Sequence, residues 1–345
     1  MVNSDASLSR LVEVWRGDQV ESVHHGVIAV SDRDGHLLAG TGDPGVVTYM
    51  RSAAKPVQLT PLVESGAAEH FGFSAEQLAI MAASHTGRPE HVDLVQSILD
   101  RIGLPASALQ CGAHQPFDAT AALTLQRAGE APGVLHNNCS GKHAGMLAYC
   151  QYHKLSTNYL SQDHPLQRRI LTTLARLAGV AESDVGVAVD GCGAPCYALP
   201  LGQAARLFAQ FANPSPDLDR ATQRALTGIR EAMAQHPSKV GGPGRFDTEL
   251  MQLTAGRVVA KSGAESFQAL MLPDRGLGVA MKVADGQGAR AIGPVVVELL
   301  HQLGICPLPD AASQLRLDAL HQPLLENHSG VVTGRLRAVY QLWWS

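Results

Sequence analysis

Short apolar runs that predict β-strands gather toward the two ends of the chain. Residues 11–15 and 20–30 alternate in polarity or are rich in β-branched side chains, and the turn Asp32-Arg33-Asp34-Gly35 joins the second run to 36–39 as a hairpin. Runs of the same character follow residue 250, at 258–261, 267–272, 278–283 and 331–340. The pattern therefore predicts strands from the first and last thirds of the chain.

Helical patterns dominate the middle. Ser74-Ala75-Glu76-Gln77 has the form of a capping box, and Gly103 with Pro105 ends a helix over 90–102. Further helices are predicted over 118–128, 165–177, 201–212, 217–235 and 289–303. This order predicts an α/β fold in which residues 1–50 and 250–345 form an antiparallel sheet and a mainly helical lobe, 51–249, is inserted. We expect a single domain of two lobes with a site between them.

Composition narrows the possible partners. The chain has 345 residues, 45% of them hydrophobic and 17% charged, and its net charge is −4 without a Lys/Arg run. This argues against nucleic acid and anionic membranes as partners. The first residues show neither the basic start nor the apolar core of a secretory signal, so we expect a cytoplasmic protein. In that setting its six cysteines should be free thiols or metal ligands.

Ser52 and Lys55 lie three positions apart, on one face of a predicted helix. A desolvated lysine can take the proton of a serine, which is otherwise a poor nucleophile, and penicillin-recognising hydrolases use Ser-x-x-Lys at a helix start. Only six of the 27 lysines and arginines are lysines, and three of those lie in clusters with Ser, Cys, His or Gly. Both residues are therefore candidates for catalysis; the alternative is a solvated lysine in a first helical turn.

Lys261-Ser262-Gly263 ends an apolar run, where lysine could supply a charge or a base and glycine would let a substrate approach closely. A Lys-Ser/Thr-Gly strand accompanies Ser-x-x-Lys in the penicillin-recognising enzymes, so the two together are more specific than either alone. The alternative is a strand-end turn with an exposed lysine. Ser84, in the small-residue loop 82–87, is a further candidate, against a serine that only caps or turns the chain.

Cysteines form the last cluster. Cys139, Lys142 and His143 lie in one polar stretch, and Cys192 lies in a second, Gly-rich one. Two thiols in such loops could bind zinc, although a lysine ligand must first lose its proton. Cys139 could instead be a thiolate nucleophile activated by His143, or the thiols could simply be buried. Residues 245–248, before a predicted helix, could cap that helix or stand over the site.

Taken together, these clusters resemble the Rhizobium-type L-asparaginases, also called the asparaginase II or class 3 family. The matching motifs follow one another along nearly the whole chain: Glu21-Ser22-x-His24-x-Gly26, Gly42-Asp43-Pro44, Arg51-Ser52-Ala53-Ala54-Lys55-Pro56, Ser84-His85, Asn138-Cys139-Ser140-Gly141-Lys142-His143, Asp190-Gly191-Cys192-Gly193-Ala194-Pro195, Arg245-Phe246-Asp247-Thr248, Lys261-x-Gly263-Ala264-Glu265 and Asp285-Gly286. One departure is Ser266, where the resemblance leads us to expect glycine, and which could tighten that turn or alter the pocket.

The resemblance implies a fold similar to serine β-lactamases and glutaminases, and hydrolysis of L-asparagine to L-aspartate and ammonia by a homodimer. It implies two Ser-Lys pairs, Ser52 with Lys55 and Ser84 with Lys261. It also implies a zinc site formed by Cys139, Lys142 and Cys192. Asp190 and His143 would lie close by. Candidates for binding the substrate are Arg51, His85, His143 and Asp190.

The mechanism we expect begins with Lys55 taking the proton of Ser52, which attacks the side-chain amide carbon. Ser84 and Lys261 pass a proton to the leaving ammonia, and water then releases aspartate. Two other readings stay open at this point. One is a penicillin-recognising hydrolase or a glutaminase, and the other is a non-catalytic protein that binds zinc or an amino acid.

Overall fold

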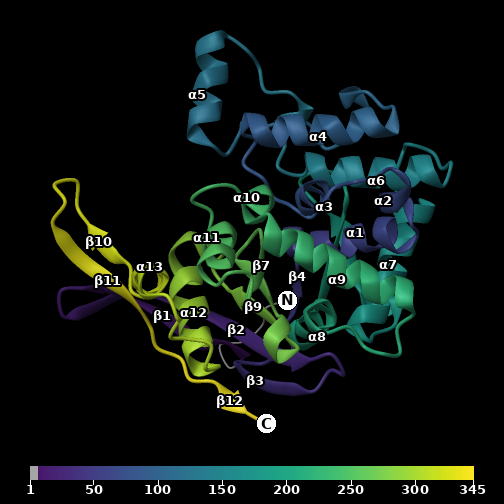
Figure 1. Cartoon of the computed structure of the whole chain (residues 1–345). Coiled ribbons are helices and arrows are strands. Elements are labelled where there is room, and N and C mark those ends of the chain that lie inside the picture. Colours follow the sequence, from purple (N-terminus) through teal and green to yellow (C-terminus); the bar gives the residue numbers. More distant parts are fainter. Residues whose placement is uncertain (1–6) are drawn as a thin grey trace.

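The computed structural model describes residues 7–345, and its largest element is a sheet of nine strands (Figure 1). Seven of them lie side by side in the order β10-β11-β1-β2-β9-β8-β7, while β3 pairs with β2 and β12. The bounds are β1 Ser9–Arg16, β2 Gln19–Asp32, β3 Leu37–Thr41, β7 Val259–Gly263, β8 Phe267–Leu272, β9 Leu277–Val283, β10 Leu324–Glu326, β11 Val332–Ala338 and β12 Trp343–Trp344. All neighbours are antiparallel. The predicted α/β class, with an antiparallel sheet drawn from both ends of the chain, is confirmed.

Strand β2 lies at the centre of this sheet. Its first half pairs with β1, and its second half pairs with β9 and β3. Residues 26–31 are all buried, without the alternation of a strand that has one face in water. Both faces are therefore covered. Helix α8 (Leu201–Ala212) packs on β2 and β9, and α12 (Gly288–Gln302) packs on β1, β9 and β11.

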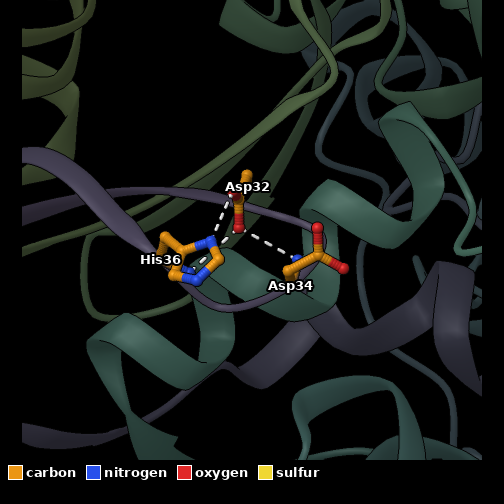
Figure 2. A group of neighbouring side chains, drawn as sticks. All are labelled: Asp32, Asp34 and His36. Atoms are coloured by element: carbon orange, nitrogen blue, oxygen red, sulfur yellow. Dashed lines mark hydrogen bonds and ion pairs between the residues drawn. The ribbon is translucent and has the colours of Figure 1, made fainter.

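A single carboxylate holds the turn between β2 and β3 (Figure 2). Asp32 Oδ1 accepts hydrogen bonds from the backbone N–H groups of Asp34 and His36, both at 2.9 Å. Asp32 Oδ2 lies 3.0 Å from His36 Nδ1. Potential metal ligands of these three side chains come within 4.8 Å of one another. The hydrogen bonds account for the cluster as a turn that stabilises the hairpin, in the manner typical of aspartate.

Most other helices gather beside the sheet, around α1 (Figure 1). Helix α1 packs against α6, α7 and α9, and most of its residues are buried. The predicted capping box at Ser74 is present at the start of α3. The bounds are α1 Lys55–Glu64, α2 Ala67–His70, α3 Ala75–Met81, α4 Pro89–Ile102, α5 Ala119–Ala128, α6 Ser140–Tyr152, α7 Pro165–Ala178, α9 Arg220–Gln235, α10 Pro237–Val240, α11 Phe246–Leu253 and α13 Ala311–His321.

A small second sheet contributes to the region between the main sheet and the helices. Its order is β4-β6-β5, with bounds β4 Val47–Tyr49, β5 Gly186–Val189 and β6 Pro195–Pro200. Strand β4 leads directly into the turn that carries Ser52, and the hairpin of β5 and β6 carries Cys192. Both predicted clusters are thus attached to the same small sheet. Across residues 7–345, no helix is both long and apolar enough to cross a membrane.

Candidate active site

Ser52 and Lys55 lie at a change of helix type. Ser52 belongs to a 3₁₀ turn, Arg51–Ala54, and Lys55 is the first residue of α1. Proline at the second position of α1 suits a helix start, because its missing N–H would have no partner there. Lys55 is only 1% exposed, whereas Ser52 is half-buried.

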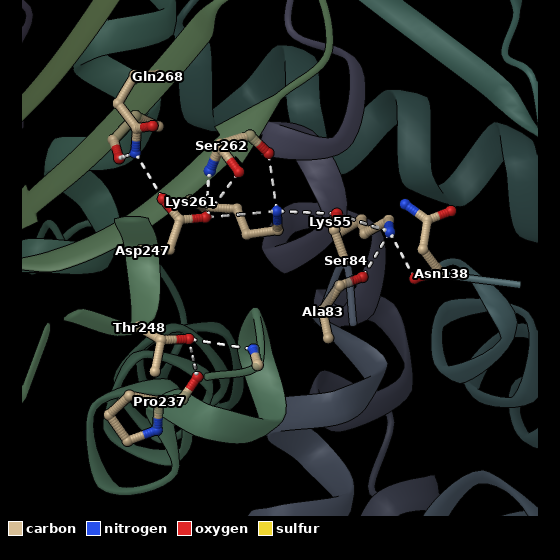
Figure 3. Close-up of polar contacts among 12 residues, drawn as sticks. Lys55, Ala83, Ser84, Asn138, Pro237, Asp247, Thr248, Lys261, Ser262 and Gln268 are labelled. Atoms are coloured by element: carbon tan, nitrogen blue, oxygen red, sulfur yellow. Dashed lines mark hydrogen bonds and ion pairs between the residues drawn. The ribbon is translucent and has the colours of Figure 1, made fainter. Parts of the chain in front are cut away.

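Ser84 lies between two buried lysine amines (Figure 3). Its Oγ is 3.0 Å from Lys55 Nζ and 3.0 Å from Lys261 Nζ. The loop after α3 that carries Ser84 is fixed by a hydrogen bond from the Ser84 N–H to the carbonyl of Val240. Lys55 Nζ also donates to the carbonyls of Ala83 and Asn138. One hydroxyl thus connects an amine from the helices with an amine from the sheet.

This geometry changes one predicted pairing. Ser84 and Lys261 are hydrogen-bonded, as expected, but among the described residues Ser52 Oγ makes no hydrogen bond with Lys55. Lys55 instead points to Ser84. The expectation placed Ser52 and Lys55 within reach of each other on one helix face; in the structure the Lys55 amine is instead engaged by Ser84 and by the carbonyls of Ala83 and Asn138.

Burial favours the neutral form of both amines. Removal from water lowers the pKa of Lys55, and the nearby Lys142 charge adds to the effect, while Cys139 and Cys192 oppose it. For Lys261, burial lowers the pKa to about 7; Asp247 opposes this shift and the charges of Lys55 and Arg245 add to it. Near neutral pH, Lys261 can therefore both give and accept a proton.

Asp247 joins the start of α11 to strands β7 and β8 (Figure 3). Its Oδ2 accepts hydrogen bonds from Ser262 N at 2.7 Å and Ser262 Oγ at 2.8 Å, and its Oδ1 accepts one from Gln268 Nε2 at 3.0 Å. Lys261 Nζ lies 3.9 Å from the same carboxylate, which is 4% exposed. Asp247 therefore holds the strand that carries Lys261 and faces its amine with a negative charge.

Gly263 is required by the chain itself. A Cβ atom at this position would lie 2.3 Å from the carbonyl oxygen of Met50. The glycine was expected to admit a substrate; it admits the backbone of the segment before Ser52 and also lines the cavity described below. The end of β7 can therefore lie directly against the turn that carries Ser52, which brings Lys261 into the site.

A cavity of ≈ 540 Å³ opens beside these groups. Its volume is that of a site for a small molecule. The cavity is lined by both serines, Ser52 and Ser84, and its wall includes four polar side chains from three other segments: Asn138, Arg245, Asp247 and Gln268.

The predicted zinc residues form a buried group behind Lys55. Lys142 Nζ lies 3.0 Å from Cys192 Sγ, and the charge of Lys142 also acts on the Cys139 thiol. The neighbouring Cys192 thiol, with the amines of Lys55 and Lys142, lowers the pKa of the Cys139 thiol well below its usual value. The structure thus brings all three residues together. Two sulfurs and one nitrogen fit the ligand preference of Zn²⁺, with Lys142 required to be neutral when it binds.

A family model of L-asparaginase II matches residues 12–338. The chain belongs to the L-asparaginase II family. This confirms the resemblance noted in the sequence. The comparison with curated proteins found no match.

Solved structures similar to this asparaginase II chain include Mglu, at 14% identity and a TM-score of 0.47, with 83% of this chain and 68% of that chain covered. Mglu in its tris and glutamate form has 14% identity and a TM-score of 0.46, and the match covers 83% of this chain and 60% of that chain. A β-lactamase (Mb2281c) from Mycobacterium bovis has 14% identity and a TM-score of 0.42, and the match covers 80% of this chain and 94% of that chain. The chain thus spans between 60% and 68% of these two Mglu structures. At TM-scores below 0.5, these matches carry no information about the reaction.

The four predicted substrate-binding residues do not line the cavity of this asparaginase II chain. Arg51 and Asp190 bind each other instead, with Arg51 Nη2 at 2.7 Å and Nε at 2.9 Å from Asp190 Oδ1. His85 is buried against Ser140 Oγ at 2.9 Å. His143 is buried too, with its Nδ1 2.9 Å from the Tyr159 hydroxyl. In this structure their contacts are with the protein.

Sequence reasoning missed three polar residues of the cavity wall. Asp247 had a signal, because the Arg-Phe-Asp-Thr motif was recognised, but its role was open between capping and the site. Gln268 had a weaker one: it is the one polar residue of the apolar strand β8, and it is 1% exposed. Asn138 lies beside Cys139, and only the cysteine was assigned a role from the sequence.

Proposed function

We propose that the protein hydrolyses the side-chain amide of L-asparagine, giving L-aspartate and ammonia. The observation that carries this proposal is the Ser84 hydroxyl, held at 3.0 Å from each of two buried amines, on the wall of a cavity that Ser52 also lines. Membership in the asparaginase II family supports an amide substrate.

In the proposed mechanism Ser52 is the nucleophile. Its hydroxyl lines the cavity and is not engaged in a hydrogen bond with another described side chain, so it is free to meet the substrate. Lys55, in neutral form, receives the Ser52 proton as Oγ bonds to the amide carbon. Collapse of the tetrahedral adduct breaks the C–N bond and leaves an aspartyl ester on Ser52.

Ser84 moves the protons. In the structure its hydroxyl accepts from both amines. When one amine is neutral, the hydroxyl can donate to that amine, so a proton can pass between Lys55, Ser84 and Lys261. The departing nitrogen takes up this proton and leaves as ammonia. Water then attacks the ester, giving a proton back to the same relay, and aspartate is released with Ser52 restored.

Zinc is proposed only as a partner of the buried thiols. Cys139, Lys142 and Cys192 would hold it. Zn²⁺ bound there would cross-link the start of α6 to the turn between β5 and β6. The Ser-Lys reaction above uses none of these three residues, although Lys55 lies close enough to Cys139 for their charges to interact. The homodimer stays a prediction from the resemblance, and the cytoplasmic location stays a prediction from the first residues of the sequence.

The test is ammonia release from L-asparagine by the wild type and by Ser52→Ala and Ser84→Ala. Ser52→Ala should abolish turnover with folding unchanged, while Ser84→Ala should lower kcat by about 10²- to 10⁴-fold, the range of lost proton transfer. Substantial turnover by Ser52→Ala would reject Ser52 as the nucleophile. Parallel assays with L-glutamine and a chromogenic β-lactam separate the other readings: faster turnover of either would replace asparagine as the proposed substrate.

A further inference from the structure

Arg245 brings an unpaired positive charge to the wall of the cavity. It directly precedes α11, and its side chain is exposed. Among residues 7–345 it forms no ion pair, although it lines the same cavity as Ser52 and Ser84. Its charge is near enough to Lys261 to act on that amine. An arginine so placed is available to a ligand.

The acid in the cavity wall cannot neutralise this arginine. Asp247 lies two residues further along, but its carboxylate already accepts three hydrogen bonds from Ser262 and Gln268 and faces Lys261. No hydrogen bond or ion pair joins Asp247 to Arg245 in the described part of the chain. The positive charge of Arg245 therefore stays uncompensated until something negative enters.

The start of α12 adds to the positive character of the same cavity. Gly288 and Ala289, its first two residues, line the cavity, and N–H groups in a first helical turn have no acceptor within the helix. Asp285 accepts from Gln287 N and so occupies only the residue before them. Ser266 also lines the cavity: it is 6% exposed, and its Oγ has no hydrogen-bond partner.

We infer that Arg245 binds the α-carboxylate of the amino-acid substrate, with the start of α12 and Ser266 beside it. This rests on the proposed function, because it assumes an amide substrate that also carries a carboxylate. Arginine can bind a carboxylate through two parallel N–H donors, and Arg245 is the one arginine among the described residues that line the cavity. Recognition of the carboxylate by Arg245 would select an amino acid over a simple amide and hold its side-chain amide near the two serines.

Two variants and two substrates test the inference. Arg245→Gln removes the charge, and Arg245→Lys keeps it without the planar pair of donors. The matched control is Arg257→Gln, a half-buried arginine that lies two residues before β7, pairs with Asp274 and is outside the cavity wall. The substrates are L-asparagine and 3-aminopropanamide, which is asparagine without its α-carboxylate.

For L-asparagine, Arg245→Gln should raise KM by about 10- to 100-fold with kcat within a few-fold, as expected for one lost charged hydrogen-bond pair. Arg245→Lys should lie between, and Arg257→Gln should equal the wild type. For 3-aminopropanamide, the wild type and Arg245→Gln should have the same kcat/KM. An unchanged KM for L-asparagine, or equal losses with both substrates, would overturn the inference.

Binding measurements separate this inference from the proposed function. By calorimetry, wild-type protein should bind L-aspartate more tightly than β-alanine, which lacks the α-carboxylate, and Arg245→Gln should remove that preference. A wild type that binds L-aspartate with this preference but releases no ammonia would reject asparaginase activity and retain the role of Arg245. A wild type without the preference would overturn the role of Arg245 whatever its turnover.

Discussion

At the scale of single residues, the site depends on what surrounds two amines. Lys55 and Lys261 come from opposite parts of the fold, and both are almost fully buried. A hydroxyl placed between them replaces the water that a solvated lysine would use. Asp247 is the charged group that most directly opposes the neutral form of Lys261. It lies there because its other contacts fix strand β7.

The first prediction concerns pH. If neutral Lys261 is needed in the relay, kcat/KM should rise as pH increases through about 7, its shifted pKa. Replacing Asp247 by Asn removes the negative charge that raises this pKa, so the rise should move to lower pH, with a lower maximal rate because the clamp on Ser262 is weakened. The facing charges of Lys55 and Arg245 stay in place. Profiles of kcat/KM against pH for both proteins measure this.

Two results would contradict it. One is a rise at the same pH in Asp247→Asn, which would show that another group controls the profile. The other is a shift to higher pH, which has the wrong sign for the loss of a carboxylate. Asp274→Asn is a suitable control, because Asp274 pairs with Arg257 at the surface and away from the cavity wall.

At the scale of secondary elements, sequence periodicity predicted most strands and helices, because each has a regular buried face or a clear cap. The bounds of α8 and β8 match the prediction, and Ser74 caps α3 as expected. Strand β6 was missed, because it begins directly after the Gly-rich loop of Cys192 and reads as part of it. Helix α13 and strand β10 are largely exposed and carry no strong pattern.

The sequence predicted which residues belong to the candidate site, but it predicted fewer of the contacts that these residues make with one another. The motifs identified both lysines, both serines and the buried thiols. The partners of the Lys55 amine come from segments distant in sequence, and the lining by Gln268 depends on strand pairing; neither is visible in local spacing. Arg51 and Asp190 were expected to hold the substrate because of their opposite charges, and the same charges bind them to each other.

The turn between β7 and β8 yields a prediction about Ser266. Both Glu265 and Ser266 have φ of 60°, a backbone region that favours glycine. Ser266 Oγ is also buried without a partner. Ser266→Gly should therefore raise the free energy of unfolding by about 1 kcal/mol, since relief of strain and of the unpaired hydroxyl outweighs the greater freedom of glycine in the unfolded chain.

Urea unfolding of Ser266→Gly and Ser266→Ala separates the two causes. Alanine removes the hydroxyl but keeps the Cβ atom, so it should recover only part of the gain. A glycine variant less stable than the wild type would show that the serine stabilises this turn through a contact outside the described hydrogen bonds. The departure from the family pattern would then have a structural advantage.

At the scale of the whole molecule, the buried thiols connect segments that are 50 residues apart in sequence, since Lys142 contacts Cys192. If zinc is bound there, protein prepared without chelator should carry about one zinc per chain. Removing the metal should lower the melting temperature, because a ligand that binds only the folded state stabilises it. Cys192→Ser should also lose the metal and lower the melting temperature. Cys150→Ala changes a buried cysteine in α6, the helix that carries Lys142, and should keep the metal.

Metal analysis of the three proteins decides this. Equal zinc in the wild type and in Cys192→Ser would place the metal elsewhere. A wild type without zinc, whose melting temperature does not respond to added Zn²⁺, would leave the three residues as a buried Lys–thiol group that packs behind Lys55.

The central position of β2 has a consequence for synthesis on the ribosome. On one edge its partners are β1 and β3, which are made just before and just after it, and on the other edge its partner is β9, which follows some 250 residues later. While the helices between them emerge, one edge of β2 lacks its neighbour, and Lys261 has not yet been translated. A nascent or truncated chain that ends before Lys261 should therefore be inert toward any substrate and expose an open apolar strand to chaperones or to aggregation.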